Sequence, residues 1–121
     1  MNVLLVEDHT DTRSVLSTLL NRCGCRTVAA KNVRDARVRL QEMHFDVLIS
    51  DLNLPDGDGI DLVREAKEAQ KLKAIAITGR TSDEERDAGL TAGFDCYLTK
   101  PIDFHELREV LKSEAASHSS R

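Results

Sequence analysis

Five short apolar segments alternate with five segments of helical periodicity, and this alternation constrains the fold more than any other feature of the chain. Each apolar segment is only a few residues long and is bounded by polar or turn residues, as expected for a buried strand. The segments lie at residues 2–6, 26–30, 45–50, 73–77 and 95–98. Strict alternation of strands and helices is typical of a parallel sheet with helices on both faces. We therefore predict an α/β fold.

Capping residues indicate where the helices begin. Asn32, Ser82 and Asp103 each precede a segment of helical spacing, and Thr10 or Asp11 is the expected cap of the first helix. Helices are also predicted from about Ile60 to Gln70 and over residues 83–92, with Gly24 and Gly93 ending the first and fourth. The apolar positions expected to face the core are Val15, Leu16, Leu19 and Leu20; Val33, Ala36, Val38, Leu40 and Met43; Ala88, Leu90 and Ala92; and Phe104, Leu107, Val110 and Leu111. The helix over 83–92 is the least apolar of the set.

These elements fit a flavodoxin-like (βα)5 three-layer sandwich around a five-stranded parallel sheet. Among the topologies that right-handed crossovers allow, we choose the strand order 2-1-3-4-5. The length of 121 residues corresponds to one domain,. We place this domain at residues 1–113 and a short polar C-terminal tail at residues 114–121, which we expect to fray.

Composition excludes several classes of function. The net charge is −4 and Lys and Arg form no cluster, so nucleic-acid binding through this chain is disfavoured,. We find neither a signal peptide nor an apolar stretch that approaches the roughly 20 residues needed to span a bilayer. The three cysteines lack metal-ligand spacing, and we interpret Cys23-Gly24-Cys25 as a helix end and a turn rather than as a redox motif,. A cytoplasmic location is the simplest expectation.

Charged and hydroxyl side chains follow four of the five predicted strands. They are Glu7 and Asp8, then Asp51, Thr78 and Lys100. The carboxyl ends of parallel strands meet at one edge of a sheet, where ligands bind in open α/β folds. Three neighbouring carboxylates repel one another and need a cation. Mg²⁺ suits them, because it binds one or two carboxylates together with water and a phosphate.

Asp51 is the best candidate nucleophile. The histidines at positions 9, 44, 105 and 118 are each interpreted as solvated or capping residues, and none is paired with a Ser or Cys. A carboxylate that attacks phosphorus forms an acyl phosphate. Mg²⁺ and Lys100 would offset the charge on the oxygens of the transferring group.

These motifs resemble those of the receiver domain of two-component response regulators, over residues 2–112. The residues that carry the resemblance are Leu4-Leu5-Val6-Glu7-Asp8, the run from Ser50 to Gly59, Ile77-Thr78-Gly79 and Tyr97-Leu98-Thr99-Lys100-Pro101. Residues 92–103 are similar to receivers appended to hybrid sensor histidine kinases. The chain is therefore expected to be either a stand-alone receiver or a domain cut from a larger protein, since too few residues follow Ser113 for a DNA-binding module.

The resemblance implies a phosphoacceptor and a metal site. Asp51 corresponds to the phosphoacceptor, and Asp8 and Asp51 to direct ligands of Mg²⁺ (or Mn²⁺). Glu7 is implied to bind the ion through water, and the backbone carbonyl of Asn53 completes the set. Such a domain is not an enzyme on other substrates, since it catalyses only its own phosphorylation and dephosphorylation.

The resemblance also implies a switch. Thr78 corresponds to a hydroxyl that moves toward the phosphoryl group, Lys100 to its ion-pair partner, and Tyr97 to an aromatic residue that turns inward. The bond between Lys100 and Pro101 is implied to be cis, although most X-Pro bonds are trans. Implied partners are a histidine kinase or histidine phosphotransfer protein and a downstream protein that binds the fourth helix, fifth strand and fifth helix. Asn53 and Arg80 occupy positions that tune the phosphoryl lifetime; Arg80 either shields the acyl phosphate or is merely solvated.

Three other functions require features that can be checked in the sequence. A haloacid-dehalogenase-like phosphatase needs an acid two residues after its nucleophile, and Asn53 stands there instead,. A flavodoxin-like cofactor binder needs a phosphate-binding loop after the first strand, where this chain has acidic residues. A degenerate receiver that serves only as an interaction module stays open, although all the expected site residues are present.

Overall fold

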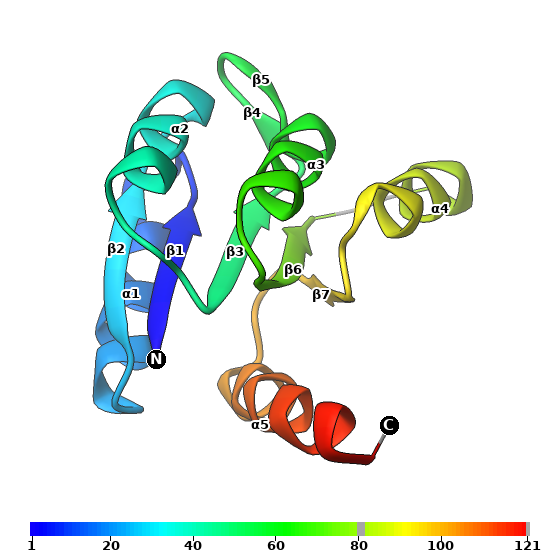
Figure 1. Cartoon of the computed structure of the whole chain (residues 1–121). Helices are drawn as coiled ribbons and strands as arrows, with labels where there is room; N and C mark the ends of the chain where they lie inside the picture. The colour runs from blue at the N-terminus through cyan, green and yellow to red at the C-terminus, as the bar shows by residue number, and fades with distance from the viewer. Residues whose placement is uncertain (80–81, 121) are drawn as a thin grey trace.

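The centre of the molecule is a five-stranded parallel sheet with helices on both faces (Figure 1). This computed structural model describes residues 1–79 and 82–120, with side chains for residues 1–79 and 82–112. The sheet strands are β1 (Asn2–Val6), β2 (Arg26–Ala30), β3 (Val47–Asp51), β6 (Lys73–Thr78) and β7 (Cys96–Thr99). Their order, β2-β1-β3-β6-β7, is the predicted 2-1-3-4-5 order when these five strands are numbered along the chain. The predicted fold class is confirmed.

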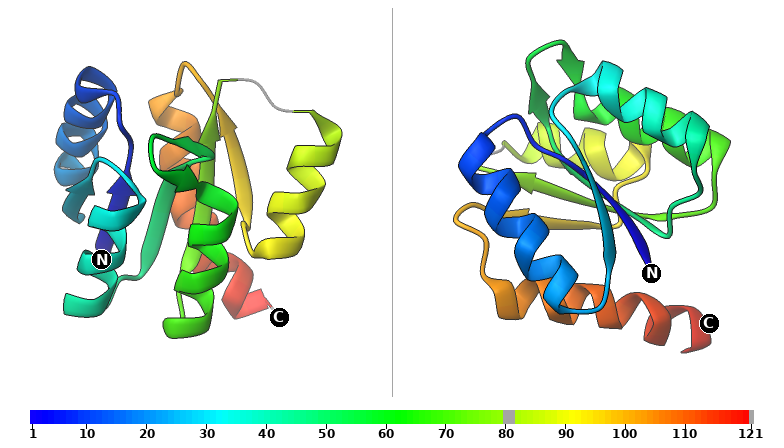
Figure 2. Two further views of the ribbon diagram at one scale, coloured as in Figure 1. Left: turned by 90° about the horizontal axis from the view of Figure 1, so that it is seen from above. Right: turned by 90° about the vertical axis from the view of Figure 1, so that its left-hand side faces the viewer.

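The helices divide between the two faces of the sheet (Figure 2). On one face lie α1 (Thr10–Arg22) and α5 (Phe104–Ser120), and on the other lie α2 (Val33–Glu42), α3 (Gly59–Ala69) and α4 (Asp83–Ala92). Successive side chains of a strand point to opposite faces, so β1 contributes to two apolar clusters. Val3 and Leu5 pack with α1 and α5, whereas Leu4 and Val6 pack with α2 and α3.

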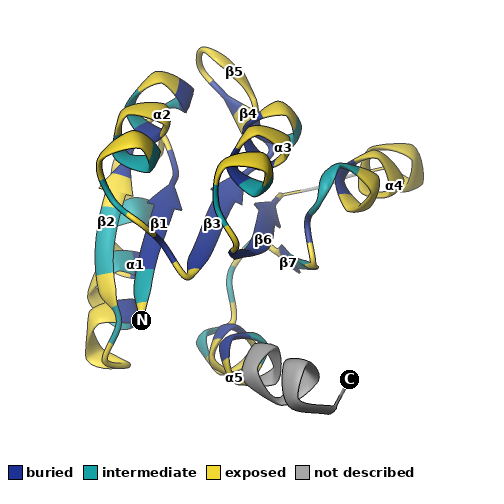
Figure 3. Ribbon diagram, in the orientation of Figure 1, coloured by how far each residue is buried: buried dark blue, intermediate teal, exposed yellow. Residues whose placement is uncertain are grey.

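The two central strands, β3 and β6, are buried along their whole length (Figure 3). Strands covered by helices on both faces are expected to be continuously apolar, yet β3 ends in Ser50 and Asp51, and β6 ends in Thr78. All three residues are buried. Lys73 at the start of β6 is also buried, and its Nζ donates to the carbonyl of Val110 at 2.7 Å. Since buried polar groups need partners, the three polar residues at the carboxyl edge of the sheet indicate a site there.

A small hairpin interrupts the loop that we predicted between β3 and α3. The two-residue strands β4 (Asn53–Leu54) and β5 (Gly57–Asp58) pair in antiparallel fashion around Pro55 and Asp56. The carboxylate of Asp56 accepts hydrogen bonds from the backbone N–H groups of Val33 at 2.8 Å and Arg34 at 3.0 Å. These bonds lower the pKa of Asp56 and fasten the hairpin to the first turn of α2.

Some helix details differ from the sequence predictions. The N-cap of α1 is His9, not Thr10 or Asp11, and no side chain caps it. In α2 the N-cap Asn32 is confirmed, with its side chain accepting from the Asp35 N–H at 2.8 Å, but Val38 is 44% exposed. Val38 lies outside the helix face that Val33 and Ala36 turn toward the sheet.

The inner face of α4 was predicted incorrectly. Ala88 and Leu90 are exposed, while Gly89 is the buried residue of this helix; of the three predicted positions, Ala92 does pack against the core, although it is only partly buried. A glycine offers no hydrophobic signal in a sequence, so its position against the sheet was missed. Ser82 is the N-cap of α4 as predicted, and it forms a capping box with Glu85.

At the C-terminus, α5 continues to Ser120, beyond the predicted start of the tail. The division into a domain and a tail stays a prediction, because the side chains after residue 112 lie outside the described part. Arg80 also lies outside it, so its proposed role is not examined by the structure. None of the helices in the described residues has the length and apolarity to cross a membrane.

Candidate functional site

Two buried carboxylates project side by side at the carboxyl edge of the sheet. β1 and β3 pair in parallel with Leu5 opposite Ile49. Glu7 and Asp51, each two residues further along the chain, therefore lie at one level on the α1 and α5 face. Glu7 is fully buried and Asp51 is 8% exposed. The register thus brings together two of the predicted site residues that are 44 positions apart in sequence.

Lys100 forms ion pairs with both carboxylates. Its Nζ lies 2.7 Å from Asp51 Oδ2 and 2.8 Å from Glu7 Oε1. Burial alone would lower the pKa of Lys100, but the contacts with Asp51 and Glu7 and their negative charges outweigh this effect and raise it. The lysine is therefore held charged between the two carboxylates.

One positive charge does not balance this cluster. Asp8, which is exposed, joins Glu7 and Asp51 so that one oxygen from each lies within 4.8 Å of the others. Oε1 of the fully buried Glu7 contacts Lys100 but receives no hydrogen bond of good geometry from the described residues. Three oxygen ligands with a residual negative charge match the preferences of a hard divalent cation. The residues present therefore fit Mg²⁺.

The loop after β1 is held by a residue that the sequence did not suggest. Nη1 of Arg13 donates to the backbone carbonyl of Glu7 at 2.8 Å and to that of Asp8 at 3.3 Å. The backbone N–H of His9 donates to Glu7 Oε2 at 3.1 Å. These bonds fix the two acidic residues relative to α1. In the sequence, the one signal for this role is that Arg13 lies one turn into the helix that follows Glu7 and Asp8.

Next to Asp51, the backbone at residues 51–52 and the backbone at Gly59 lie close together. The backbone N–H of Asn53 donates to Asp51 Oδ1 at 3.2 Å, and that of Gly59 donates to the carbonyl of Leu52 at 2.8 Å. A Cβ atom at Gly59 would overlap the backbone carbonyl of Asp51 and lie 3.0 Å from Leu52 Cα. A residue without a side chain is therefore required where α3 begins. The second Asp-Gly pair of the loop, Asp58-Gly59, is the feature of the sequence that corresponds to this requirement. No separate role for Gly59 was predicted from the sequence.

Thr78 and Tyr97 share the opposite face of the sheet. Ala76 lies opposite Tyr97 in the pairing of β6 with β7, and Thr78 is two residues beyond Ala76,. Thr78 is 3% exposed and lies one residue beyond Ile77, the partner of Asp51 in the β3–β6 ladder. The structure thus brings Thr78 to the edge that holds the carboxylates, with Tyr97 behind it.

Tyr97 is packed against α4. Its hydroxyl donates to the carbonyl of Arg86 at 3.2 Å, and the Arg86 guanidinium lies 5.3 Å from the ring centre. The Phe94 ring meets it edge-on with centroids 5.9 Å apart. Burial raises the pKa of Tyr97. A Cβ atom at Gly89 would collide with the hydroxyl of Tyr97, so the side chain occupies a notch that only glycine provides.

Beside the site, an apolar groove of about 540 Å³ runs between α1 and the segment after β7. Val15, Leu16 and Leu19 of α1 line one side, and Lys100 and Ile102 line the other. The prediction that Val15 faces the core is wrong, because this side chain is 57% exposed and lines the groove. The groove also includes Pro101, and the peptide bond from Lys100 to Pro101 is cis, as predicted.

A family model described as the response regulator receiver domain matches residues 3–112. The chain is 39% identical over 110 residues to an uncharacterized 14.6 kDa protein of Leptolyngbya boryana. That match covers 88% of this chain and 84% of the Leptolyngbya protein. It is 34% identical over 119 residues to the KDP operon transcriptional regulatory protein KdpE of Escherichia coli. That match covers 98% of this chain but 53% of KdpE, so the chain spans about half the length of that regulator.

Solved structures show the same fold. The chemotaxis protein CheY4 of Vibrio cholerae superposes with a TM-score of 0.86 at 30% identity, covering 93% of this chain and 96% of that one. A CheY-like receiver domain protein of Methanospirillum hungatei gives a TM-score of 0.92 at 26% identity, covering 98% and 96%. The similarity thus extends over nearly the whole chain in both sequence and structure.

Proposed function

The chain belongs to the response regulator receiver family, and from this we propose that Asp51 is the phosphoacceptor of a Mg²⁺-dependent two-component switch. The observation that carries the proposal is the position of Asp51, which is buried, pairs with Lys100 and shares an acidic cluster with Glu7 and Asp8. Asp51 therefore lies close to a fixed cation and next to a site for a second one. This is the environment that phosphoryl transfer to a carboxylate requires.

The transfer follows from these side chains. A carboxylate oxygen of Asp51 attacks the phosphorus of a phosphohistidine, an O–P bond forms, and the N–P bond of the donor breaks, which leaves the electron pair on the imidazole nitrogen. Lys100 Nζ, 2.7 Å from Asp51, stabilises the charge on the oxygens of the group in flight,. We assign Asp8 and Asp51 as direct Mg²⁺ ligands, Glu7 as a ligand through water, and the Asn53 carbonyl as the last protein ligand. Mg²⁺ would supply further positive charge at the phosphoryl oxygens.

The groove beside the site is the proposed docking place for the donor. It presents the exposed Val15 next to Leu19 and Ile102, and it leads to Lys100 at the site. We propose that a helix of a histidine kinase or histidine phosphotransfer protein lays its apolar face here and so directs its phosphohistidine toward Asp51. Exposed apolar side chains rimmed by polar groups are typical of such contacts.

We further propose that Thr78 and Tyr97 transmit the change. The added phosphoryl oxygens attract the Thr78 hydroxyl, and the space that Thr78 vacates admits the ring of Tyr97. Tyr97 then leaves its contacts with Arg86 and Gly89, so α4 loses the side chain that attaches it to the sheet. The surface formed by α4, β7 and α5 changes, and a downstream protein binds it differently. This is a shift between two states of one fold.

Phosphorylation by acetyl phosphate tests the assignment. With Mg²⁺ present, intact-mass analysis should show the addition of one phosphoryl group to the wild type and none to Asp51→Asn. Asp61→Asn, which changes an exposed carboxylate on α3, should be labelled like the wild type. Labelling of Asp51→Asn to the wild-type extent would refute the assignment. Sustained turnover of a phosphate ester would instead favour the phosphatase alternative that Asn53 argues against.

A further inference from the structure

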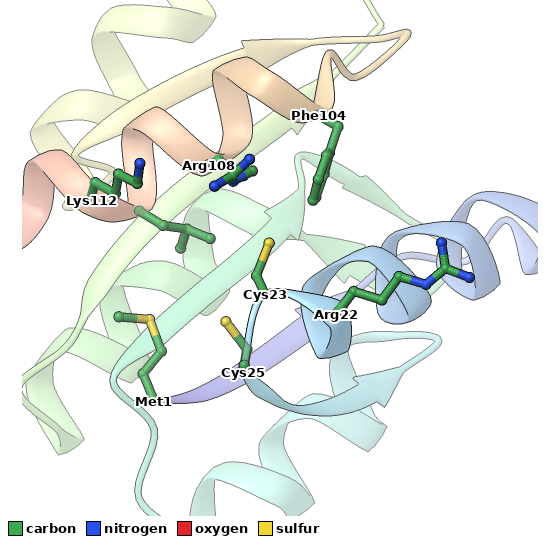
Figure 4. A pocket seen from close by; sticks show the side chains of 9 residues that line it. Met1, Arg22, Cys23, Cys25, Phe104, Arg108 and Lys112 are labelled. Atoms are coloured by element: carbon green, nitrogen blue, oxygen red, sulfur yellow. The ribbon is translucent and has the colours of Figure 1, made fainter.

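A second cavity lies at the other end of α1, where the function proposed above has no role for it. It encloses about 570 Å³ between the last turn of α1 and α5 (Figure 4). The 13 residues of α1 place it about 20 Å along that helix from the acidic site,. The cavity is lined by Cys23, Cys25, Phe104, Arg108 and Lys112, among others.

The sequence alone indicated only a helix end and a turn at Cys23-Gly24-Cys25, but in the structure both thiols of this segment also line the cavity. Figure 4 shows the Sγ atom of Cys23 pointing toward α5, with the Sγ atom of Cys25 beside it. Cys23 is exposed, whereas Cys25 is partly buried. Burial raises the pKa of Cys25, and a negative charge on Cys23 raises it further, while the N-terminal amino group acts in the opposite direction. The pair thus combines an accessible thiol with a neighbour that stays protonated.

The cavity is positively charged although the chain as a whole carries a net charge of −4. Arg22, Arg108 and Lys112 line it, and among the side chains that the structure describes no acidic one does. Nζ of Lys112 lies 3.8 Å from Oε2 of the exposed Glu109, and this carboxylate partly offsets the charge of the lysine. Arg22 points away from the thiols in Figure 4, whereas Arg108 and Lys112 lie on α5, across the cavity from Cys23. Such a cavity favours an anionic molecule.

From this arrangement we propose that Cys23 and Cys25 form a redox-active dithiol that reacts with small anionic disulfides of the glutathione type. The thiolate of Cys23 attacks one sulfur of the disulfide, which forms a mixed disulfide and releases the first thiolate. Cys25 then loses its proton to solvent and attacks Sγ of Cys23, which releases the second thiolate and leaves a Cys23–Cys25 disulfide. The dithiol is oxidised by two electrons, and the small disulfide is reduced to two thiols.

The local backbone permits this bond. Residues two positions apart are separated by at most about 7 Å between Cα atoms in an extended chain. Gly24 has a φ of +88°, which turns the chain and shortens that separation. A disulfide requires Cα atoms within about 7 Å. A side chain at position 24 would strain this left-handed conformation, so the glycine between the cysteines is suited to the turn.

The test is reaction of the full chain with glutathione disulfide, followed by alkylation of the remaining thiols and peptide mapping. In the wild type, Cys23 and Cys25 should escape alkylation together as a disulfide, while Cys96 is alkylated. Cys25→Ser should stop at one glutathione on Cys23, and Cys23→Ser should leave Cys25 reduced on the same timescale. First reaction at Cys25 or Cys96, or a wild type that stays fully reduced, would overturn the proposal.

The charge requirement has its own control. Arg108→Gln should slow the reaction of Cys23 with glutathione disulfide by at least about threefold at low salt. Its rate with the neutral bis(2-hydroxyethyl) disulfide should change much less. Arg34→Gln removes an equal charge from α2, on the other face of the sheet, and should leave both rates unchanged. Equal slowing with both disulfides, or none with glutathione disulfide, would show that the cavity does not select an anion.

Discussion

Substitution of Gly89 by alanine tests whether the notch in α4 holds Tyr97 in its observed position. The added methyl group would occupy the place of the Tyr97 hydroxyl and would lie 3.4 Å from Phe94 Cδ2. Tyr97 must therefore leave its present contacts. On the proposed mechanism its alternative position is the inward one that follows phosphorylation, so Gly89→Ala should favour the switched state before any phosphoryl group is added.

The magnitude follows from the contacts that Tyr97 would lose. They are a hydrogen bond to the Arg86 carbonyl, the Arg86 guanidinium over the ring, and the edge-on contact with Phe94. These contribute about 0.5–1.5, 0.5–1 and 0.5–1.5 kcal/mol respectively. Some contacts are remade inward, so we expect the equilibrium to shift by about 1–3 kcal/mol, which corresponds to roughly 5- to 150-fold. The higher helix propensity of alanine acts on α4 in both states and does not change this equilibrium.

Tyr97 itself provides the assay, because it is the one tyrosine in a chain without tryptophan. Tyrosine fluorescence and its quenching by acrylamide therefore report on this side chain alone. In Gly89→Ala the signal should resemble that of the wild type saturated with beryllofluoride and Mg²⁺, and the affinity for beryllofluoride should rise. The affinity for beryllofluoride stops rising once most molecules already have Tyr97 in the inward position, because the fraction of the binding-competent state cannot exceed one.

A double-mutant cycle excludes an indirect effect of the helix. In a Tyr97→Ala background no ring occupies the notch, so adding Gly89→Ala should leave the beryllofluoride affinity unchanged. If Gly89→Ala raised the affinity equally in both backgrounds, or left the affinity and fluorescence of the wild type unaltered, the reasoning from the notch would be wrong.

Three further predictions address the site and its support. Lys100→Met removes the cation that now occupies the carboxylate cluster, so Mg²⁺ affinity measured by calorimetry should rise while the rate of phosphorylation by acetyl phosphate falls; a fall in Mg²⁺ affinity would contradict this role. Gly59→Ala should destabilise the domain by about 1–3 kcal/mol in urea unfolding, because the methyl group overlaps the backbone of Asp51 and Leu52,. The pKa of Asp56 is lowered in the folded state, so its stabilising effect is present above its unfolded pKa and is lost as the pH falls through its folded pKa,. Asp56→Asn should therefore be less stable than the wild type at neutral pH, and urea unfolding in acid should show that difference shrinking, whereas a constant difference would argue against the charge.

Local sequence patterns were sufficient for the elements that they encode directly. The apolar runs that end at Val6 and Ile77 identified strands, and Asn32 and Ser82 identified helix starts that the structure retains. Parallel pairing then made the convergence of Glu7, Asp51 and Lys100 predictable, since it depends only on strand ends that share one edge. The receiver resemblance added the cis bond before Pro101, which no periodicity could indicate.

The missed features depend on contacts between distant segments or on the absence of a side chain. Asp56 binds the start of α2 across 23 positions, and nothing local to Asp56 distinguishes that bond from an ordinary turn. Gly89 was overlooked because hydrophobic patterns reward large side chains, and the neighbouring Leu90 was chosen in its place although it is 46% exposed. The residue that α4 turns toward the sheet must be a glycine, because the side chain of Tyr97 from β7 fills the space where a Cβ atom at position 89 would lie.

Lys100 connects the resting site with the proposed switch through its charge. In the structure it is a counterion shared by Glu7 and Asp51, and its raised pKa keeps it protonated there. A divalent cation bound at Glu7, Asp8 and Asp51 would neutralise the remaining charge of the cluster and weaken the hold of both carboxylates on the lysine. On the proposed mechanism, phosphorylation of Asp51 would replace its carboxylate charge with the larger charge of a phosphoryl group, so the site would become negative again beyond the end of β3. Lys100 is anchored next to that position by the bond from its backbone N–H to the Thr78 carbonyl at 2.8 Å. The same lysine can therefore follow the charge from carboxylate to phosphoryl group, and its backbone bond links that movement to the strand that carries Thr78.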